Sequence, residues 1–146
     1  MKGDMIKSLV VTLLLLGAVT AAAASLQRVT IAGKASFWVE VVSTPEERAR
    51  GLGYRDSLPL DQGMLFLFEE PDYHAFWMRG MRFPLDILWI REGVVVHIEE
   101  NIPPPSPLHL RLPTYRPAEK ADSVLEINAG LVQKYGLQLG DTVDYR

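Results

Sequence analysis

Apolar and polar positions alternate along much of the chain in short runs that are separated by turn signals. Residues 28–31 (RVTI) and 35–43 (ASFWVEVVS) are rich in β-branched and aromatic side chains and flank an Ala-Gly-Lys turn, which predicts a hairpin. Within the second run Phe37, Val39 and Val41 occupy alternate positions, so we expect them to face the core.

A short helix is predicted directly after this hairpin. Thr44 can cap the helix, Pro45 suits the first helical position, and Glu47 completes a capping box. The pattern ends at Gly51 or Gly53, because glycine favours the end of a helix. Four more strands follow, at residues 63–68, 74–78, 85–90 and 94–99, and Glu-Gly at 92–93 predicts a tight hairpin turn between the last two.

The C-terminal third begins with a proline-dense segment. Residues 101–117 contain six prolines and predict a long surface loop, because proline cannot donate ladder hydrogen bonds. A strand is predicted at 123–127, a helix at 129–135 with Asn128 as its cap, and a last strand at 142–145. Seven or eight short strands with two short helices predict a β-rich α+β fold: a single compact domain with a curled or barrel-like, mostly antiparallel sheet.

The first 24 residues predict a secretory signal peptide. Lys2 and Lys7 precede the apolar run 8–19, and TAAAAS supplies the small residues of a cleavage site. The competing interpretation is an uncleaved anchor, but the uncharged run 8–24 falls short of the roughly 20 residues that span a bilayer. We therefore expect an exported, periplasmic or extracellular domain of residues 25–146 that meets a membrane only through this segment if it is not cleaved.

Charge and cysteine content narrow the function further. The formal net charge of −3 argues against nucleic acid as a partner, because phosphates favour a basic face. The chain has no cysteine, which excludes disulfides and a lipid-modified cysteine, so the core must hold the fold unaided.

Polar residues within the apolar strands mark the candidate chemistry. Asp86 lies inside PLDILWI and Glu126 inside VLEIN, where a carboxylate is costly unless it is paired or exposed. We expect a pocket that binds a small polar ligand such as a carbohydrate, since aromatic rings stack on sugar C–H faces while acids bind the hydroxyls. The expected ligand-binding residues are aromatic, acidic or basic: Trp77, Arg79, Asp86, Glu126, Arg55 and His74.

Two other functions stay open. Asp86 and Glu126 can form the acid/base pair of a hydrolase or lyase. Alternatively, the proline-dense loop is the contact surface of a non-enzymatic cell-envelope interaction protein. No G-x-S-x-G motif is present, and the three histidines lack the spacing of a zinc site, so no catalytic residue, metal or cofactor is predicted.

The runs GMLFLF, HAFWMRGMRFPLDILWI and VLEINAG, followed by YGLQLGD, stand in an order that resembles the prokaryotic family called domain of unknown function 192. The resemblance covers residues 46–143 and centres on Phe-Trp-Met at 76–78 followed by Pro-Leu-Asp at 84–86. It implies a compact β-rich fold, often exported, with no established activity, substrate or cofactor.

The chain departs from the family pattern at one place. The usual residues after Phe-Trp-Met are Lys-Asn-Thr, and here they are Arg79, Gly80 and Met81. The positive charge remains, but the amide and the hydroxyl are lost, so chemistry that needs those two groups is not expected. The proline-dense loop also lacks the cysteines of some members, so a redox role is not predicted.

Overall fold

The computed structural model describes residues 25–108 and 111–145. The predicted signal peptide, residues 1–24, lies outside the described residues. In the described part of the chain, no helix is long and apolar enough to cross a membrane. The helices are α1 (Pro45–Arg50) and α2 (Leu131–Tyr135), and the strands are β1 (Gln27–Ile31), β2 (Ala35–Val42), β3 (Gln62–Asp72), β4 (Phe76–Trp77), β5 (Leu85–Arg91), β6 (Val94–Ile102), β7 (Thr114–Tyr115), β8 (Ala121–Asn128) and β9 (Val143–Asp144).

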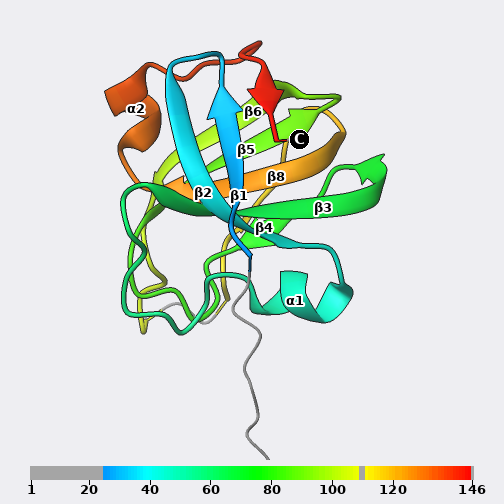
Figure 1. The fold of residues 1–146 in the computed structure, drawn as a ribbon. Helices are drawn as coiled ribbons and strands as arrows, with labels where there is room; N and C mark the ends of the chain where they lie inside the picture. Colours follow the sequence, from blue (N-terminus) through cyan, green and yellow to red (C-terminus); the bar gives the residue numbers. More distant parts are fainter. Residues whose placement is uncertain (1–24, 109–110, 146) are drawn as a thin grey trace, which may run out of the picture.

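The sheet is curled, as predicted. Seven strands follow the order β6-β5-β8-β3-β2-β1-β9, and only the β2–β3 pair among them is parallel. Figure 1 shows β1 and β2 turned across the front of β3 and β8. At one end a bridge between Val94 and Thr142 brings the two outer edges of the sheet together, which makes a curled half-barrel.

Two apolar cores lie on opposite faces of the sheet. The inner core contains Phe37, Val39, Leu65 and Leu125, and α2 contributes Leu131 at one end of the curl. The outer core lies on the other face of β3, β8 and β5 and includes Phe66, Ile87, Trp89 and Val124. Because β5 and β8 are covered on both faces, every residue from Leu85 to Ile90 is buried.

The local predictions for the first helix and the hairpins are confirmed. The Thr44 hydroxyl accepts a hydrogen bond from the Glu47 amide at 3.3 Å, and the Glu47 carboxylate accepts one from the Thr44 amide at 3.1 Å. Helix α1 ends at Gly51. Glu92 and Gly93 both have positive φ, at 50° and 73°, as the tight turn between β5 and β6 requires.

Three predictions made from local pattern need correction. The strand expected at 74–78 is only two residues long, and the proline-dense segment contains β7, which pairs with β4. Asn128 does not cap α2, which begins at Leu131 with Gly130 as its N-cap residue. The Asn128 amide instead donates to the carbonyl of Leu58 at 2.9 Å, because the long β8 carries this residue beside the turn before β3.

Candidate functional site

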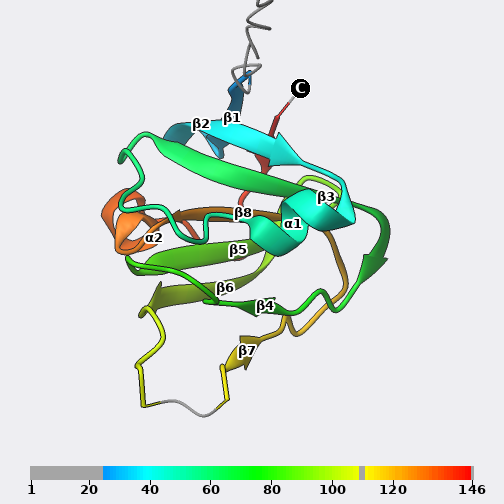
Figure 2. The same cartoon turned by 90° about the horizontal axis from the view of Figure 1, so that it is seen from below.

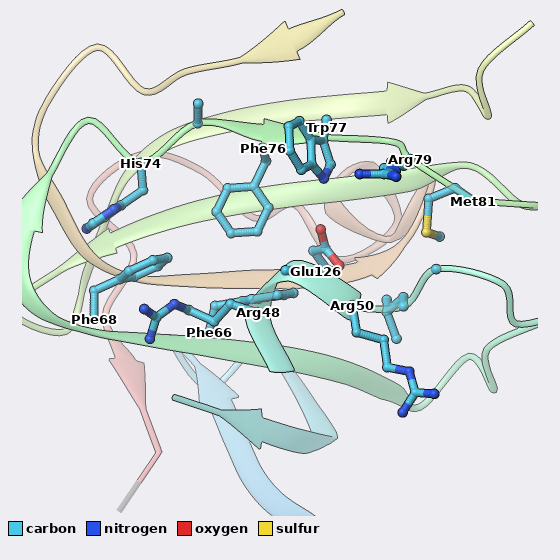
Figure 3. A pocket seen from close by; sticks show the side chains of 15 residues that line it. Arg48, Arg50, Phe66, Phe68, His74, Phe76, Trp77, Arg79, Met81 and Glu126 are labelled. Carbon is cyan, nitrogen blue, oxygen red and sulfur yellow. The ribbon is translucent and has the colours of Figure 1, made fainter. Parts of the chain in front are cut away.

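A cavity of about 210 Å³ lies on the outer face of the sheet, between α1 and the segment that contains β4. Seen from below, α1 lies across the sheet near β8, and β4 runs along the other side with β7 next to it (Figure 2). Figure 3 shows the lining side chains from close by. The lining residues are basic, aromatic or otherwise apolar, with one acid: Arg48, Ala49, Arg50, Gly51, Leu52, Gly53, Phe66, Phe68, His74, Ala75, Phe76, Trp77, Arg79, Met81 and Glu126.

Aromatic rings form the walls of this pocket. Phe76 packs edge-on against Phe66, with ring centroids 4.9 Å apart, and against the buried Trp89 at 5.8 Å. His74 stacks on Phe68 with centroids 3.5 Å apart. Trp89 also donates its indole N–H to the His74 carbonyl at 2.9 Å, so the outer core fixes the backbone of the wall.

Glycines bring the two walls close together at one end. A Cβ atom on Gly53 would lie 3.1 Å from the Arg79 carbonyl oxygen, so only glycine fits there without a shift. The Tyr54 amide donates to the Gly80 carbonyl at 2.8 Å, and the Tyr54 ring lies against the Gly80 Cα. Gly80 has a φ of +71°, a conformation that asparagine also tolerates. A Cβ atom at this position would lie 2.9 Å from the Tyr54 ring, so the ring occupies space that an asparagine side chain would need.

Glu126 is the acid of the pocket, and it points into the cavity from β8 (Figure 3). The residue is only 5% exposed, and no described residue forms a hydrogen bond with its carboxyl group. No described side-chain polar atom is fully enclosed without a partner, so the carboxyl oxygens remain accessible from the cavity. Burial raises the pKa of this carboxyl from 4.5 to about 8, because the charged form loses its hydration. The group is therefore mostly neutral at pH 7 and can donate a hydrogen bond.

Arginines supply the charge around the cavity. Arg48 is held in place, with its guanidinium 4.8 Å from the Phe68 ring centroid and a hydrogen bond to the Leu67 carbonyl at 3.1 Å. Arg79 is exposed and makes no ion pair with any described residue. Figure 3 shows Arg79 beside Trp77 and shows the Arg50 side chain extending away from the cavity.

Asp86 lies elsewhere, although the sequence placed it in the same pocket. It is fully buried, and its two carboxylate oxygens accept the backbone amides of Asn101 at 2.8 Å and Val132 at 2.9 Å. In the β5–β8 ladder Asp86 is opposite Ile127, whereas Glu126 is opposite Ile87. Side chains on successive strand residues point to opposite faces, so the two carboxyl groups are separated by the sheet and cannot act together on one bond.

The other expected site residues divide between the pocket and the scaffold. Trp77 and His74 line the cavity, and Trp77 is 47% exposed. Arg55 does not line the cavity. It forms a bidentate ion pair with Glu40, at 2.5 and 2.9 Å, on β2. The structure therefore brings together Trp77, Arg79, Glu126 and His74 of the six.

Sequence reasoning missed the contribution of α1. The residues 45–50 and the glycines at 51 and 53 were interpreted only as the body and end of a helix, and Phe66, Phe68 and Phe76 were not singled out as site residues. The signal in the sequence is R-A-R-G-L-G at residues 48–53, where two arginines precede two glycines. This pattern indicates a cationic turn that can approach another backbone closely.

Comparisons with known proteins agree on the fold and do not establish a function. The family model "DUF192: Uncharacterized ACR" matches residues 27–145. A crystal structure of a protein of unknown function from Novosphingobium aromaticivorans DSM 12444 is 34% identical, with a TM-score of 0.75, over 82% of this chain and 85% of that one. A protein from Sinorhizobium meliloti 1021, described as a "putative transcription regulator", is 31% identical with a TM-score of 0.75, over 84% of this chain and 95% of that one. No curated protein matches the sequence.

Proposed function

The chain belongs to the domain of unknown function 192 family, and we propose that it binds a small polar ligand in the pocket between α1 and β4. The observation that carries this proposal is Glu126, a residue that is 5% exposed, whose carboxyl group has no hydrogen-bond partner among the described residues and faces a cavity. The carboxyl oxygens are accessible only from the cavity, since the residue is otherwise buried. A ligand with a complementary polar group can reach the carboxyl group there and form a hydrogen bond in place of water.

The walls support the same proposal. The volume of about 210 Å³ is below the roughly 300–1,000 Å³ of drug-sized sites, so the ligand is small or inserts only one group. Trp77 offers a half-exposed ring at the mouth, and Phe66 and Phe76 offer apolar surface further in. A planar body or a sugar face can stack on such rings while its polar group reaches Glu126.

Binding without catalysis fits this arrangement better than an acid/base mechanism. The expected partner acid, Asp86, lies on the other face of the sheet and is already bonded to two backbone amides. A single neutral carboxyl group can orient a ligand, but hydrolysis by paired carboxylates requires two on one side of the bond. We do not extend the transcription role in the description of the S. meliloti protein to this chain, because a net charge of −3 is opposite to what DNA phosphates favour.

The compartment is part of the proposal. If residues 1–24 act as a signal peptide, the binding takes place outside the cytoplasm, where small nutrients and cell-wall fragments are available. Labelling the N-terminus of the protein purified from its host would test this. A mature chain starting near residue 25 in the exported fraction supports export, and an intact N-terminus in the cytosol argues against it.

A thermal-shift screen with small acids, amines, sugars and alcohols tests the binding proposal. A ligand at 100 times its Kd should stabilise the protein by about 2.7 kcal/mol, a shift of several degrees for a domain of this size. Trp77→Ala should abolish the shift, and Trp38→Ala is the matched control, because both tryptophans are 47% exposed but Trp38 does not line the pocket. Equal losses in both variants, or no shift with any compound class, would count against the proposal.

A further inference from the structure

The charges around the pocket define the kind of ligand that it takes. Three arginines line the cavity and the only acid that lines it is Glu126. Since this carboxyl group is mostly neutral at pH 7, the pocket is cationic in a chain whose net charge is −3. A positive potential in a partly closed cleft attracts an anionic ligand strongly, because the surrounding protein screens the charges less than water does.

The arginines differ in their freedom to meet a ligand. The Arg48 guanidinium donates hydrogen bonds to the carbonyls of Ser43 and Leu67 and lies over the Phe68 ring. Arg48 therefore adds positive charge to the pocket, but its donors are already used by the protein. Arg79 has no ion-pair partner among the described residues and lies beside Trp77 at the mouth. Its guanidinium is therefore the group that can form a two-pronged contact with a carboxylate.

Glu126 lies deeper, between the two walls (Figure 3). Its strand neighbours on the same face bring no charge, because Met64 of β3 and Ile87 of β5 are opposite it in the ladders. The charged or titratable residues that line the cavity with it are Arg48 and Arg50 from α1, and His74 and Arg79 from the segment around β4. Of these, the Arg50 side chain extends away from the cavity (Figure 3). An uncharged carboxyl group in this place donates one hydrogen bond into the cavity.

We propose that the ligand is a small organic carboxylate with an apolar body, whose charged group binds Arg79 at the mouth and whose inner hydroxyl or carbonyl oxygen accepts a hydrogen bond from Glu126. This inference rests on the proposed function and adds the class of ligand. An amine would need the opposite arrangement, with an ionised Glu126, and would meet the repulsion of the three arginines. The aromatic side chains of the pocket would contact the apolar part of a carboxylate or of an amine equally well. The charge of the ligand and its hydrogen bond to Glu126 therefore determine which of the two binds.

Three probes with the same body separate the alternatives: 4-(hydroxymethyl)benzoate, 4-(aminomethyl)benzyl alcohol and 1,4-benzenedimethanol. They differ in one end group, which is an anion, a cation and a neutral hydroxymethyl respectively. Titration calorimetry at pH 7 should rank the affinities as anion, then neutral, then cation. Arg79→Gln should weaken binding of the benzoate by about tenfold and leave the neutral probe nearly unchanged. Arg91→Gln is the control, because Arg91 is also exposed but does not line the pocket.

The pH dependence tests the role of Glu126. If the protonated group binds the ligand, affinity for the benzoate should fall by about tenfold per pH unit above pH 8. Glu126→Gln keeps a donor of the same shape that does not titrate, so its affinity should stay level from pH 6 to 9. The Arg79→Gln variant should keep the wild-type pH slope, because it still contains Glu126, the group to which the slope is assigned.

The outcomes separate this inference from the proposal that it rests on. Preference for the amine, or affinity that rises with pH, would overturn the carboxylate class while leaving the pocket a binding site. The same holds if sugars bind in a Trp77-dependent way and none of the three probes does. Absence of binding by every compound class tested would overturn both.

Discussion

Replacing Glu126 with glutamine should stabilise the protein, and the gain should grow with pH. Burial raises the pKa of this carboxyl from 4.5 to about 8, so between these values the native state holds a proton that the unfolded chain releases. The free energy of unfolding of the wild type therefore falls as pH rises through this window, by about 1.4 kcal/mol per pH unit. Glutamine has nearly the same shape and does not titrate.

The size of the stability change follows from the interval between the pKa of Glu126 in the unfolded chain and its pKa in the native state. We expect the stability difference, variant minus wild type, to rise between pH 5 and 8 and to level off above pH 8, with a total change of roughly 3–5 kcal/mol. That is a large share of the roughly 5–15 kcal/mol by which domains are stable. Urea unfolding at each pH, followed by tryptophan fluorescence, measures the free energies directly.

Glu40→Gln is the matched control for this series. A side-chain hydrogen bond from Arg55 lowers the pKa of Glu40, against the opposing effect of its partial burial, so its titration lies below pH 4.5. The stability that this pair contributes is fully present above that pH and is lost only on acidification. The difference between Glu40→Gln and wild type should therefore stay constant from pH 5 to 9. A constant difference for Glu126→Gln as well would refute the conclusion that burial raises the pKa of its carboxyl group.

Three substitutions test how the scaffold holds the site. Asp86→Asn should cost about 2–4 kcal/mol in urea unfolding, because a buried carboxylate that accepts two amides is replaced by a group with one acceptor oxygen, yet ligand affinity should not change. Gly80→Ala should cost more than about 1 kcal/mol in thermal unfolding, because φ is +71° and the new Cβ would lie 2.9 Å from the Tyr54 ring. Trp89→Phe should cost about 1–3 kcal/mol and weaken ligand binding, because the indole donor that fixes the His74 carbonyl is lost.

Each of these three has a control or an outcome that contradicts it. Gly33→Ala has a similar φ of +67° but no atom within 4 Å of the new Cβ, so it should cost only the backbone strain. An equal cost at both glycines would show that the ring contact at Gly80 is unimportant. Loss of ligand affinity in a folded Asp86→Asn protein would contradict its assignment to the scaffold, and unchanged affinity in Trp89→Phe would show that the wall does not depend on that hydrogen bond.

The parts of the fold that depend on near neighbours follow from the sequence. The capping box of α1 joins residues three apart, and the Glu-Gly turn between β5 and β6 is set by the backbone preferences of two residues. The alternation in β2 places Phe37 and Val39 in the core because strand side chains repeat with a period of two. The β-rich class and the family membership rest on the same local patterns taken in order along the chain.

Only the tertiary structure distinguishes the two acids of the expected site. Asp86 and Glu126 look alike in sequence, since each is a carboxylate between apolar neighbours in a strand. The register of β5 against β8 places them on opposite faces of the sheet. Asp86 then accepts hydrogen bonds from two backbone amides of distant segments, whereas Glu126 lines a cavity between α1 and β4. Strand register and the partners of a buried charge arise from contacts between residues far apart in the chain, which periodicity within a single strand does not encode.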